Sequence, residues 1–422
     1  MATDQSSGLR HAGRALRHRN YRLYFMGQAV SLVGTWITRV AQQWLVYRLT
    51  NSPLWLGLIG FCMQVPTSIL SAPAGVLADR WDRRKMLLAT QILAMMKSLT
   101  LAALAFSGKI QVWHVAALAL FQGVVDSFEI PARQSLAVEL TGREDLPNAI
   151  ALNSMLFNGG RMVGPAIAGV LVAAVGEGTC FLVDGVSFLA VIAMLLAMNL
   201  VPKAAAHKNG SVWQGLREGV SYARSHPNIR AVLVLLGVIS LLGFPHLVLM
   251  PIFATKIFAG DANTLGRLVA SAGTGALLGT FFLATRSAKA PSARLVRAAC
   301  VTGGAALMGF SYSSLLPLSM VLLAVTGFSM LVVITSGNVL VQTLVNDQMR
   351  GRVMALFGVA VIGALPYGSL LAGALAEKIG AQATVLLGGL VCVLAGLFLT
   401  EKLHVEEAPS AIEPIPAPEM AE

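Results

Sequence analysis

The sequence predicts an all-α membrane protein with twelve transmembrane helices in two pseudo-symmetric six-helix halves. Three observations support this fold class: twelve long apolar stretches, positive charge that alternates between loops, and an internal repeat of glycines. Of the 422 residues, 56% are hydrophobic and only 12% are charged. This composition is typical of a chain whose solvent is mostly lipid, and it disfavours a soluble protein with a single buried core.

The apolar stretches each hold about 17–30 residues, enough to cross a hydrocarbon layer of about 30 Å as a helix. The first twenty residues are polar and basic, and the first span is too long for a signal-peptide core. We therefore expect this span to be retained as an uncleaved anchor. The predicted spans begin near Tyr21, Pro53, Met86, Gln111, Pro147, Thr179, Ile229, Ala262, Arg297, Leu316, Arg352 and Gln382.

Lysine and arginine are distributed unequally between the two sets of loops. If the N-terminus is cytoplasmic, the cytoplasmic segments hold 22 of these residues and the outer loops hold 5. The positive-inside rule then places both termini in the cytoplasm. The net charge of +11 is explained by this topology, so the sequence predicts no nucleic-acid partner.

An offset of 204 residues superposes seven of the eighteen glycines in the first 210 residues on glycines of the second half, where about two are expected by chance. Such a repeat indicates duplicated halves of a transporter. A short helix is expected over 211–224, at the cytoplasmic surface. The predicted organisation is a cytoplasmic N-terminal segment at 1–20, a first six-helix half at 21–200, a cytoplasmic linker at 201–228, a second half at 229–400 and a disordered cytoplasmic tail at 401–422.

The loop after the second span carries the most specific motif, Gly-Val-Leu-Ala-Asp-Arg-Trp-Asp-Arg-Arg-Lys at 75–85. It resembles the G-x-x-x-D-R-x-x-R-[RK] signature of the major facilitator superfamily, with Asp82 where many members have glycine. The resemblance implies a gating latch between the halves. The alternative, a loop that is basic only because it faces the cytoplasm, does not explain the glycine and the first aspartate of the motif. The predicted latch residues are Gly75, Asp79, Arg80, Arg83, Arg84 and Arg133.

The fifth span contains a second motif, with Gly160, Gly164, Pro165 and Gly169 at close spacing. It resembles the G-x-x-x-G-P-x-x-G-G pattern of proton-coupled antiporters of the same superfamily. Small residues four apart let helices touch, and the proline removes one backbone hydrogen bond so that the helix can bend. The alternative is ordinary small-residue packing, which is common in transporters.

Charged residues at membrane depth all lie in the first half, and such residues are functional candidates because they are costly in lipid. Five of them form the predicted proton-coupling and charge cavity. Arg39 and Lys97 could instead extend toward an interface. The five predicted cavity residues are Asp126, Glu129, Arg39, Arg161 and Asp184.

Asp126 is the preferred proton carrier among the three carboxylates. Glu129 has Arg133 one helical turn away, which favours its ionised form. Asp184 starts its span near the outer face, where we expect water to keep it charged. Asp126 has no cation next to it on its own helix and is better placed to change its protonation as a cavity opens and closes.

The segment from Asp126 to Gln134 resembles the D-x-x-x-x-P-A-R-Q signature of the secretion-effector branch, which includes the enterobactin exporter and macrolide efflux proteins. The resemblance covers roughly residues 14 to 400. It implies the major facilitator fold, a bacterial inner membrane location and an efflux function.

The second half holds only uncharged or weakly basic polar groups at membrane depth. His246, Asn338, Gln342 and Tyr367 are the candidates for a substrate cavity there, although a lone histidine beside a proline is more often a packing residue. A cavity charged on one wall and mostly apolar on the other suits an amphipathic organic molecule. The four cysteines lie singly, and we find no catalytic residues, metal cluster or nucleotide motif.

The predicted function is proton-coupled export of an amphipathic small organic molecule, such as a siderophore, a macrolide or another drug-like compound, by alternating access. We expect no cofactor besides the proton gradient, a monomer, and membrane lipid, substrate and protons as partners. Two alternatives remain: a flippase or importer of a lysophospholipid or other lipid, and a transporter-like membrane sensor.

The topology predicts the outcome of reporter fusions. A fluorescent protein fused after Glu422 should fluoresce, and alkaline phosphatase fused there should be inactive, because phosphatase folds only outside the cytoplasm. Phosphatase fused after Lys109, in a predicted outer loop, is the matched control and should be active. An active phosphatase at the C-terminus would contradict the assigned sidedness.

Overall fold

The computed structural model describes residues 14–198, 212–286 and 292–401, and these residues are almost entirely helical. The segments predicted at 1–20, 201–228 and 401–422 lie wholly or partly outside them. In the first half the elements are η1 (Arg14–Arg17), α2 (Arg19–Thr50), α3 (Pro53–Arg80), α4 (Arg83–Phe106) and α5 (Val112–Ala197).

The element α5 contains three successive transmembrane helices. The chain turns back at Gly142 and Gly176, whose φ angles of 69° and 79° are in a region that glycine adopts without steric cost. The first half therefore has six helices, counted as α2, α3, α4 and the three parts of α5.

The second half is less regular than the first. Two of its spans are composite: α7 to η4 form one and α12 to α13 form another, and π-helical turns interrupt both. Prolines at 245, 251 and 366 lack the N–H that a regular helix requires. The elements are α6 (Val212–Ser225), α7 (Pro227–Val238), η2 (Ile239–Gly243), η3 (Phe244–Leu249), α8 (Met250–Ile252), η4 (Phe253–Ile257), α9 (Ala262–Thr285), α10 (Ala293–Tyr312), α11 (Leu316–Leu344), α12 (Arg350–Gly358), η5 (Val359–Gly363), α13 (Leu365–Ile379) and α14 (Ala381–Glu401).

The predicted fold class is confirmed. Within the described residues, ten helices are long and apolar enough to cross a membrane. One of them, Glu144–Ala197, contains two spans because of the turn at Gly176, and the more polar α2 completes the twelve. The observed helices begin within four residues of the predicted positions.

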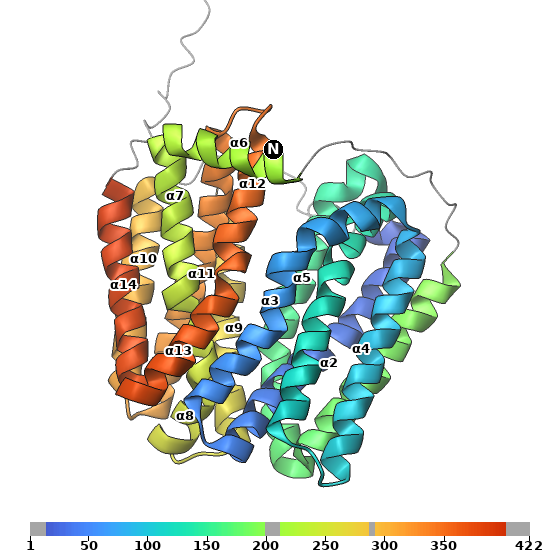
Figure 1. The fold of residues 1–422 in the computed structure, drawn as a ribbon, viewed down its shortest axis with the longest axis vertical. Helices are drawn as coiled ribbons and strands as arrows, with labels where there is room; N and C mark the ends of the chain where they lie inside the picture. Colours follow the sequence, from blue (N-terminus) through green and yellow to red (C-terminus); the bar gives the residue numbers. More distant parts are fainter. Residues whose placement is uncertain (1–13, 199–211, 287–291, 402–422) are drawn as a thin grey trace, which may run out of the picture.

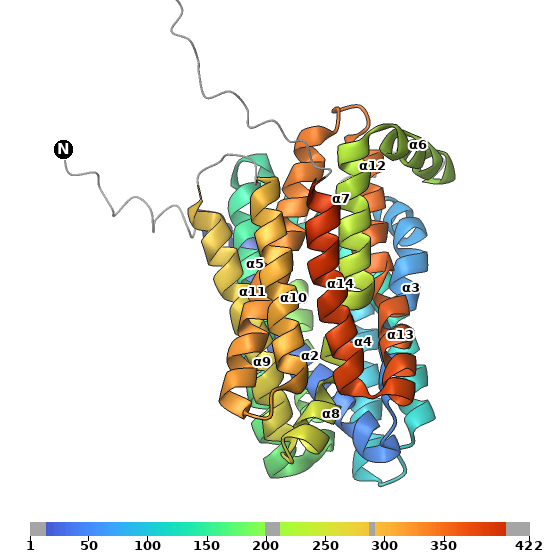
Figure 2. The same ribbon diagram turned by 90° about the vertical axis from the view of Figure 1, so that its left-hand side faces the viewer.

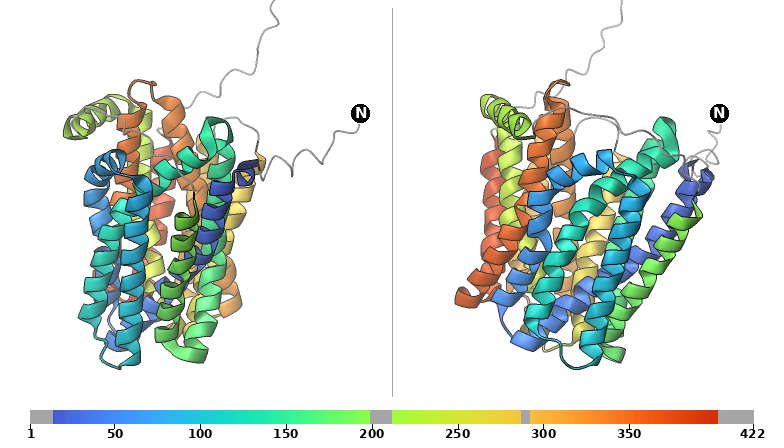
Figure 3. Two further views of the ribbon diagram at one scale, coloured as in Figure 1. Left: turned by 90° about the vertical axis from the view of Figure 1, so that its right-hand side faces the viewer. Right: turned by 45° about the vertical axis from the view of Figure 1, so that its right-hand side comes forward.

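The helices form two bundles that lie side by side, α2 to α5 in one and α7 to α14 in the other (Figure 1). The bundles diverge toward the end at which α6 lies and approach each other at the opposite end. The predicted surface helix is present as α6, which crosses the end of the second bundle (Figures 2 and 3). An ion pair of 2.8 Å between Glu218 and Arg352 ties it to α12.

Two glycine crossings join the bundles at the end where they approach. On one side, a Cβ added to Gly57 of α3 would lie 2.5 Å from the Ser369 carbonyl oxygen and 2.9 Å from the Gly373 Cα atom. On the other, a Cβ at Gly169 of α5 would lie 3.1 Å from the Gly266 Cα atom of α9. Gly169 and Gly373 are related by the 204-residue repeat, so the repeat places a glycine in each crossing.

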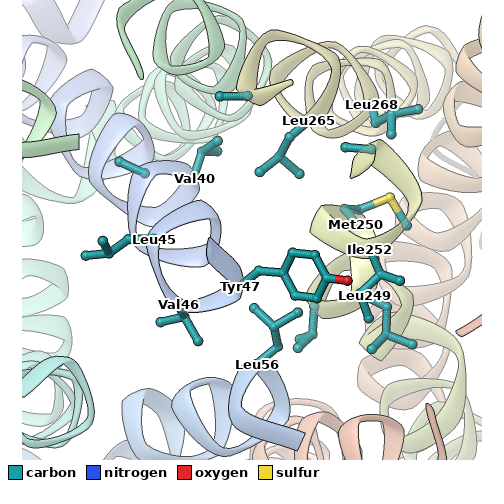
Figure 4. Packing of buried hydrophobic residues seen from close by; sticks show 14 of the residues in the cluster. Val40, Leu45, Val46, Tyr47, Leu56, Leu249, Met250, Ile252, Leu265 and Leu268 are labelled. Atoms are coloured by element: carbon teal, nitrogen blue, oxygen red, sulfur yellow. The ribbon is translucent and has the colours of Figure 1, made fainter. Parts of the chain in front are cut away.

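Next to these crossings, the apolar core between the bundles surrounds Tyr47 of α2. Figure 4 shows its ring between Leu56 and the segment that carries Leu249 and Ile252. Only 3% of Tyr47 is exposed, and its hydroxyl has no hydrogen-bond partner among the described residues. This packing closes the molecule at the end opposite to α6.

The substitution Gly57→Val should weaken the closed end, because the added side chain overlaps the backbone of α13. A cost of at least about 1 kcal/mol for overpacking corresponds to about fivefold more of the state in which this end is open. The measurement is labelling of Val46→Cys by a membrane-impermeant maleimide added on the side of the membrane that the closed end faces, in a background without native cysteines. Gly358→Val is the matched control, since no described atom lies within 4 Å of its Cβ. Equal labelling rates in both variants would contradict the expectation.

Candidate functional site

A cavity of about 340 Å³ lies between the two bundles. This volume is within the range of sites for drug-sized ligands, about 300–1,000 Å³. The first bundle supplies walls from α2, α3 and α5, and the irregular segments of the second bundle supply most of the rest. The lining residues are Trp36, Arg39, Val40, Gln42, Gln43, Val46, Leu56, Ile59, Gly60, Met63, Gln64, Thr67, Asp126, Ile130, Arg161, Phe244, Pro245, Leu247, Val248, Val269, Ile362, Leu365 and Ser369.

Three of the predicted charged residues meet in this cavity. Arg39 comes from α2, and its guanidinium lies 4.9 Å from the ring centroid of Trp36, a cation–π distance. Asp126 and Arg161 come from α5, and Gln122 donates a hydrogen bond of 2.7 Å to Asp126. The structure thus places Arg39, Asp126 and Arg161, three of the five residues of the predicted charge cavity, in the lining of one cavity.

The glycine motif of α5 brings these residues together. Cβ atoms added to Gly160 and Gly164 would contact Trp36 of α2, so α5 packs closely against the helix that carries Arg39. The Pro165 carbonyl lies 2.5 Å from the Cβ position of Gly266, in the crossing with α9. The backbone of α5 stays helical at Pro165, because its non-helical residues are glycines 142 and 176. In this conformation the motif acts through close packing.

Asp184 lies in a different cluster, and the expectation that water surrounds it is wrong. It is 1% exposed, accepts a hydrogen bond of 2.7 Å from Ser98 and interacts electrostatically with Lys97. Lys97 is 6% exposed and therefore does not extend to an interface. Gly34 of α2 leaves the space for the Asp184 carboxylate, whose Oδ1 is 3.0 Å from the position of its absent Cβ. Helix rotation rather than depth in the span decides this burial.

Glu129 and Arg133 form an ion pair of 3.8 Å on one face of α5, as their spacing predicts. Neither residue belongs to the cavity lining. Glu129 is the carboxylate near Arg133 in this conformation, and the assignment of Arg133 to the latch with Asp79 stays a prediction. The side chains of Asp79 and Arg80 lie outside the described part of the structure.

The other predicted latch residues make contacts within the first bundle. Arg83 pairs with Glu139 of α5 at 3.1 Å, and Arg84 donates to the carbonyls of Leu195 and Leu196, where α5 ends. These contacts stabilise a helix C-terminus. No described atom lies within 4 Å of a Cβ at Gly75, so no described helix packs closely against this glycine in this conformation.

Asp82, which departs from the superfamily signature, has a local role. Its side chain accepts hydrogen bonds from the backbone N–H groups of Arg84 and Lys85 and caps the first turn of α4. Sequence reasoning missed this cap, although an aspartate followed by a helical span is the usual signal for one.

The predicted cavity residues of the second half do not line the cavity. His246 is 5% exposed and lies behind the lining, with Nδ1 donating to the Gly243 carbonyl at 2.7 Å, so the packing alternative describes it better. Gln342 hydrogen-bonds to Asn338 on the same helix. Tyr367 is 51% exposed, with its ring 5.9 Å from that of Phe61. Their polarity was the only signal, and it does not specify which way a helix face points.

Several uncharged polar residues of the cavity were missed. Gln42 and Gln43 belong to α2, Gln64 and Thr67 to α3, and Ser369 to α13. The low hydropathy of α2, which separates it from the other spans, is the signal that could have indicated its cavity-lining face.

Two bundles of six transmembrane helices around one central, partly charged cavity define a membrane transporter of the major facilitator type rather than an enzyme. The family comparison agrees. The model of the transmembrane secretion effector family matches residues 12–422, and the chain belongs to this family.

Curated relatives and solved structures are similar over nearly the whole chain. The staphyloferrin A transporter of Staphylococcus aureus is 25% identical over 390 residues, 91% of this chain and 97% of its own length. The multidrug efflux pump Tap of Mycolicibacterium fortuitum is 27% identical, with 90% and 95% covered. Macrolide efflux protein A of Streptococcus pyogenes is 24% identical, with 89% and 96% covered.

Among solved structures, an inward-facing, occupied bacterial homologue of the human lysosomal transporter Spinster has a TM-score of 0.72 at 12% identity, covering 91% of this chain and 97% of its own. The nucleoside transporter NupG has a TM-score of 0.70 at 12% identity, covering 92% and 100%. At these identities the likeness shows the shared fold.

The Lys97–Asp184 cluster predicts a non-additive effect on stability. Asp184→Asn and Lys97→Met should each lower the melting temperature of the purified protein, because each leaves a buried charge uncompensated, at a cost of up to about 3 kcal/mol. The double variant should lose less than the sum of the single losses. Lys109→Met, at an exposed loop position, is the control. Additive losses would show that the two charges do not stabilise each other.

Proposed function

We propose that the protein exports an amphipathic small organic molecule in exchange for protons, as a monomer, by alternating access. The cavity supports this proposal because it combines charged groups from the first bundle with mostly apolar groups from the second. The relatives support it by their names, which describe transport of staphyloferrin A, of several drugs and of macrolides.

With both termini in the cytoplasm, the end at which the bundles diverge faces inward and the end at Tyr47 faces outward. The conformation described above is then the inward-facing one, ready to load substrate from the cytoplasm. Rocking of the bundles would separate the glycine crossings at the outer end and close the inner end.

We propose that the latch acts only after this change. In the inward-facing state Arg83, Arg84 and Arg133 are held within the first bundle. Closure at the inner end would bring the loop with Asp79 and Arg80 against the second bundle, where Gly75 permits a close approach.

The observation that carries the proposed coupling is the position of Asp126. Among the described residues that line the cavity it is the only carboxylate, and the amide of Gln122 orients it. Glu129 is paired with Arg133 and Asp184 is buried in the cluster with Lys97. Asp126 is therefore the carboxylate best placed to exchange a proton with the cavity as it opens to each side in turn.

Substitution of Asp126 should uncouple transport from the gradient. A panel of amphipathic compounds is first tested for proton release from the purified protein. The compound that causes the largest proton release is then used for the transport assay. In inverted vesicles, Asp126→Asn should lose accumulation driven by a pH gradient, by at least about tenfold, while keeping substrate binding and downhill exchange.

The control for this experiment is Asp347→Asn, which removes an exposed carboxylate outside the cavity and should behave as the wild type. A gradient dependence that is unchanged in Asp126→Asn would remove Asp126 from the coupling mechanism. A panel without any proton release would contradict proton coupling itself.

A further inference from the structure

Two arginines line the cavity without a direct ion pair to a described carboxylate, although Arg39 interacts electrostatically at longer range with Asp184 and Glu129. Arg39 of α2 and Arg161 of α5 both line the cavity and interact electrostatically with each other, as like charges. Within the described part of the chain, neither forms an ion pair. The Arg39 guanidinium lies over the Trp36 ring. Near Arg161, the backbone of α5 packs closely against the backbone of α9.

This arrangement differs from the other buried charges of the first bundle. Arg133 has Glu129 at 3.8 Å and Arg83 has Glu139 at 3.1 Å. Charges inside a membrane protein normally face one another or a functional cavity, because an uncompensated charge is costly. Unlike Arg133 and Arg83, the two arginines of the cavity have no described ion-pair partner, and both face the space in which a ligand could bind.

The single carboxylate of the lining does not neutralise them. Asp126 accepts its hydrogen bond from Gln122, so the cavity has two cationic groups and one anionic group. The described lining therefore carries an excess of positive charge. A substrate with a negative group would supply the missing partner.

The uncharged part of the lining indicates the chemistry of the rest of the substrate. Most of it is aliphatic or aromatic, as shown by Val40, Ile59, Met63 and Val248 together with the Trp36 ring. Such a surface binds an apolar body rather than a small polar ion. The guanidinium groups offer planar forks that match a carboxylate in a bidentate geometry.

We propose that the transported molecule is an amphipathic organic anion whose carboxylate binds between Arg39 and Arg161, with its apolar body against α3 and η3. This inference rests on the proposed export function and adds to it the charge class of the substrate. Cationic and neutral amphipathic molecules of the same size would bind more weakly, because they leave both arginines unpaired.

The test measures binding of three probes that share one ring system: pyrenebutyrate, its neutral primary amide, and the corresponding primary amine. The full-length protein is purified into nanodiscs of uncharged lipid, and energy transfer from tryptophan to pyrene is measured without any pH gradient. Protein-free nanodiscs correct for partition of each probe into lipid. The wild type should bind the carboxylate at least about tenfold more tightly than the amide or the amine, as expected for a charge-assisted bidentate contact.

Variants assign the preference to the two arginines. Arg161→Gln and Arg39→Gln should each reduce the carboxylate preference to about threefold or less. Arg161→Lys keeps the positive charge but lacks the planar guanidinium for bidentate binding, so it should retain an intermediate preference. The matched control Arg267→Gln, at an exposed position of α9, should bind like the wild type. Because the wild-type comparison needs no variant, poor folding of a substituted protein does not decide the outcome.

Three results would overturn the proposal. Saturable binding of all three probes with equal affinity would contradict anion selectivity and leave the export function standing. A carboxylate preference that persists in both glutamine variants would place the anion elsewhere. Absence of saturable binding by every probe also counts against the anion site. The proposed function is judged separately, by proton release from the purified protein and by gradient-driven transport in vesicles.

Discussion

The cost of a charged side chain inside hydrocarbon is the constraint on which the rest of this structure depends. All the charged residues at membrane depth belong to the first bundle, and each has one of two environments. Arg133 and Lys97 lie beside a carboxylate inside the bundle. Arg39 and Arg161 instead line the cavity, where the protein leaves their charge available. The face of the helix on which a charge occurs thus decides whether it lies inside the bundle or lines the cavity.

The second bundle contributes shape rather than charge. Its cavity wall comes mainly from η3, η5 and α13, where π-helical turns and prolines interrupt the regular hydrogen-bond ladder. Such interruptions are frequent at functional sites, because they displace side chains and let a helix bend. A wall with interrupted helices, facing a wall of regular helices in the first bundle, is consistent with one bundle moving against the other.

Glycine crossings hold the two bundles together where they meet. Gly57 and Gly373 approach on one side, Gly169 and Gly266 on the other, and even one Cβ would overlap the opposing backbone. Contacts between small residues bury little apolar area and leave few interlocking side chains, so they hold helices closely while allowing them to separate. Nearby, the buried Tyr47 ring fills the space between the bundles at this end.

The sequence by itself determined the number, length and order of the helices, the surface helix before the second bundle and the charged character of the cavity. These properties depend on local hydropathy, because the lipid acts on each span separately. Only the tertiary structure decided which residues meet. His246 lies behind the cavity wall, Asp184 beside Lys97 and Arg83 against Glu139. The physical reason is that each partnership depends on the rotation and tilt of two packed helices, which the composition of either helix alone leaves free.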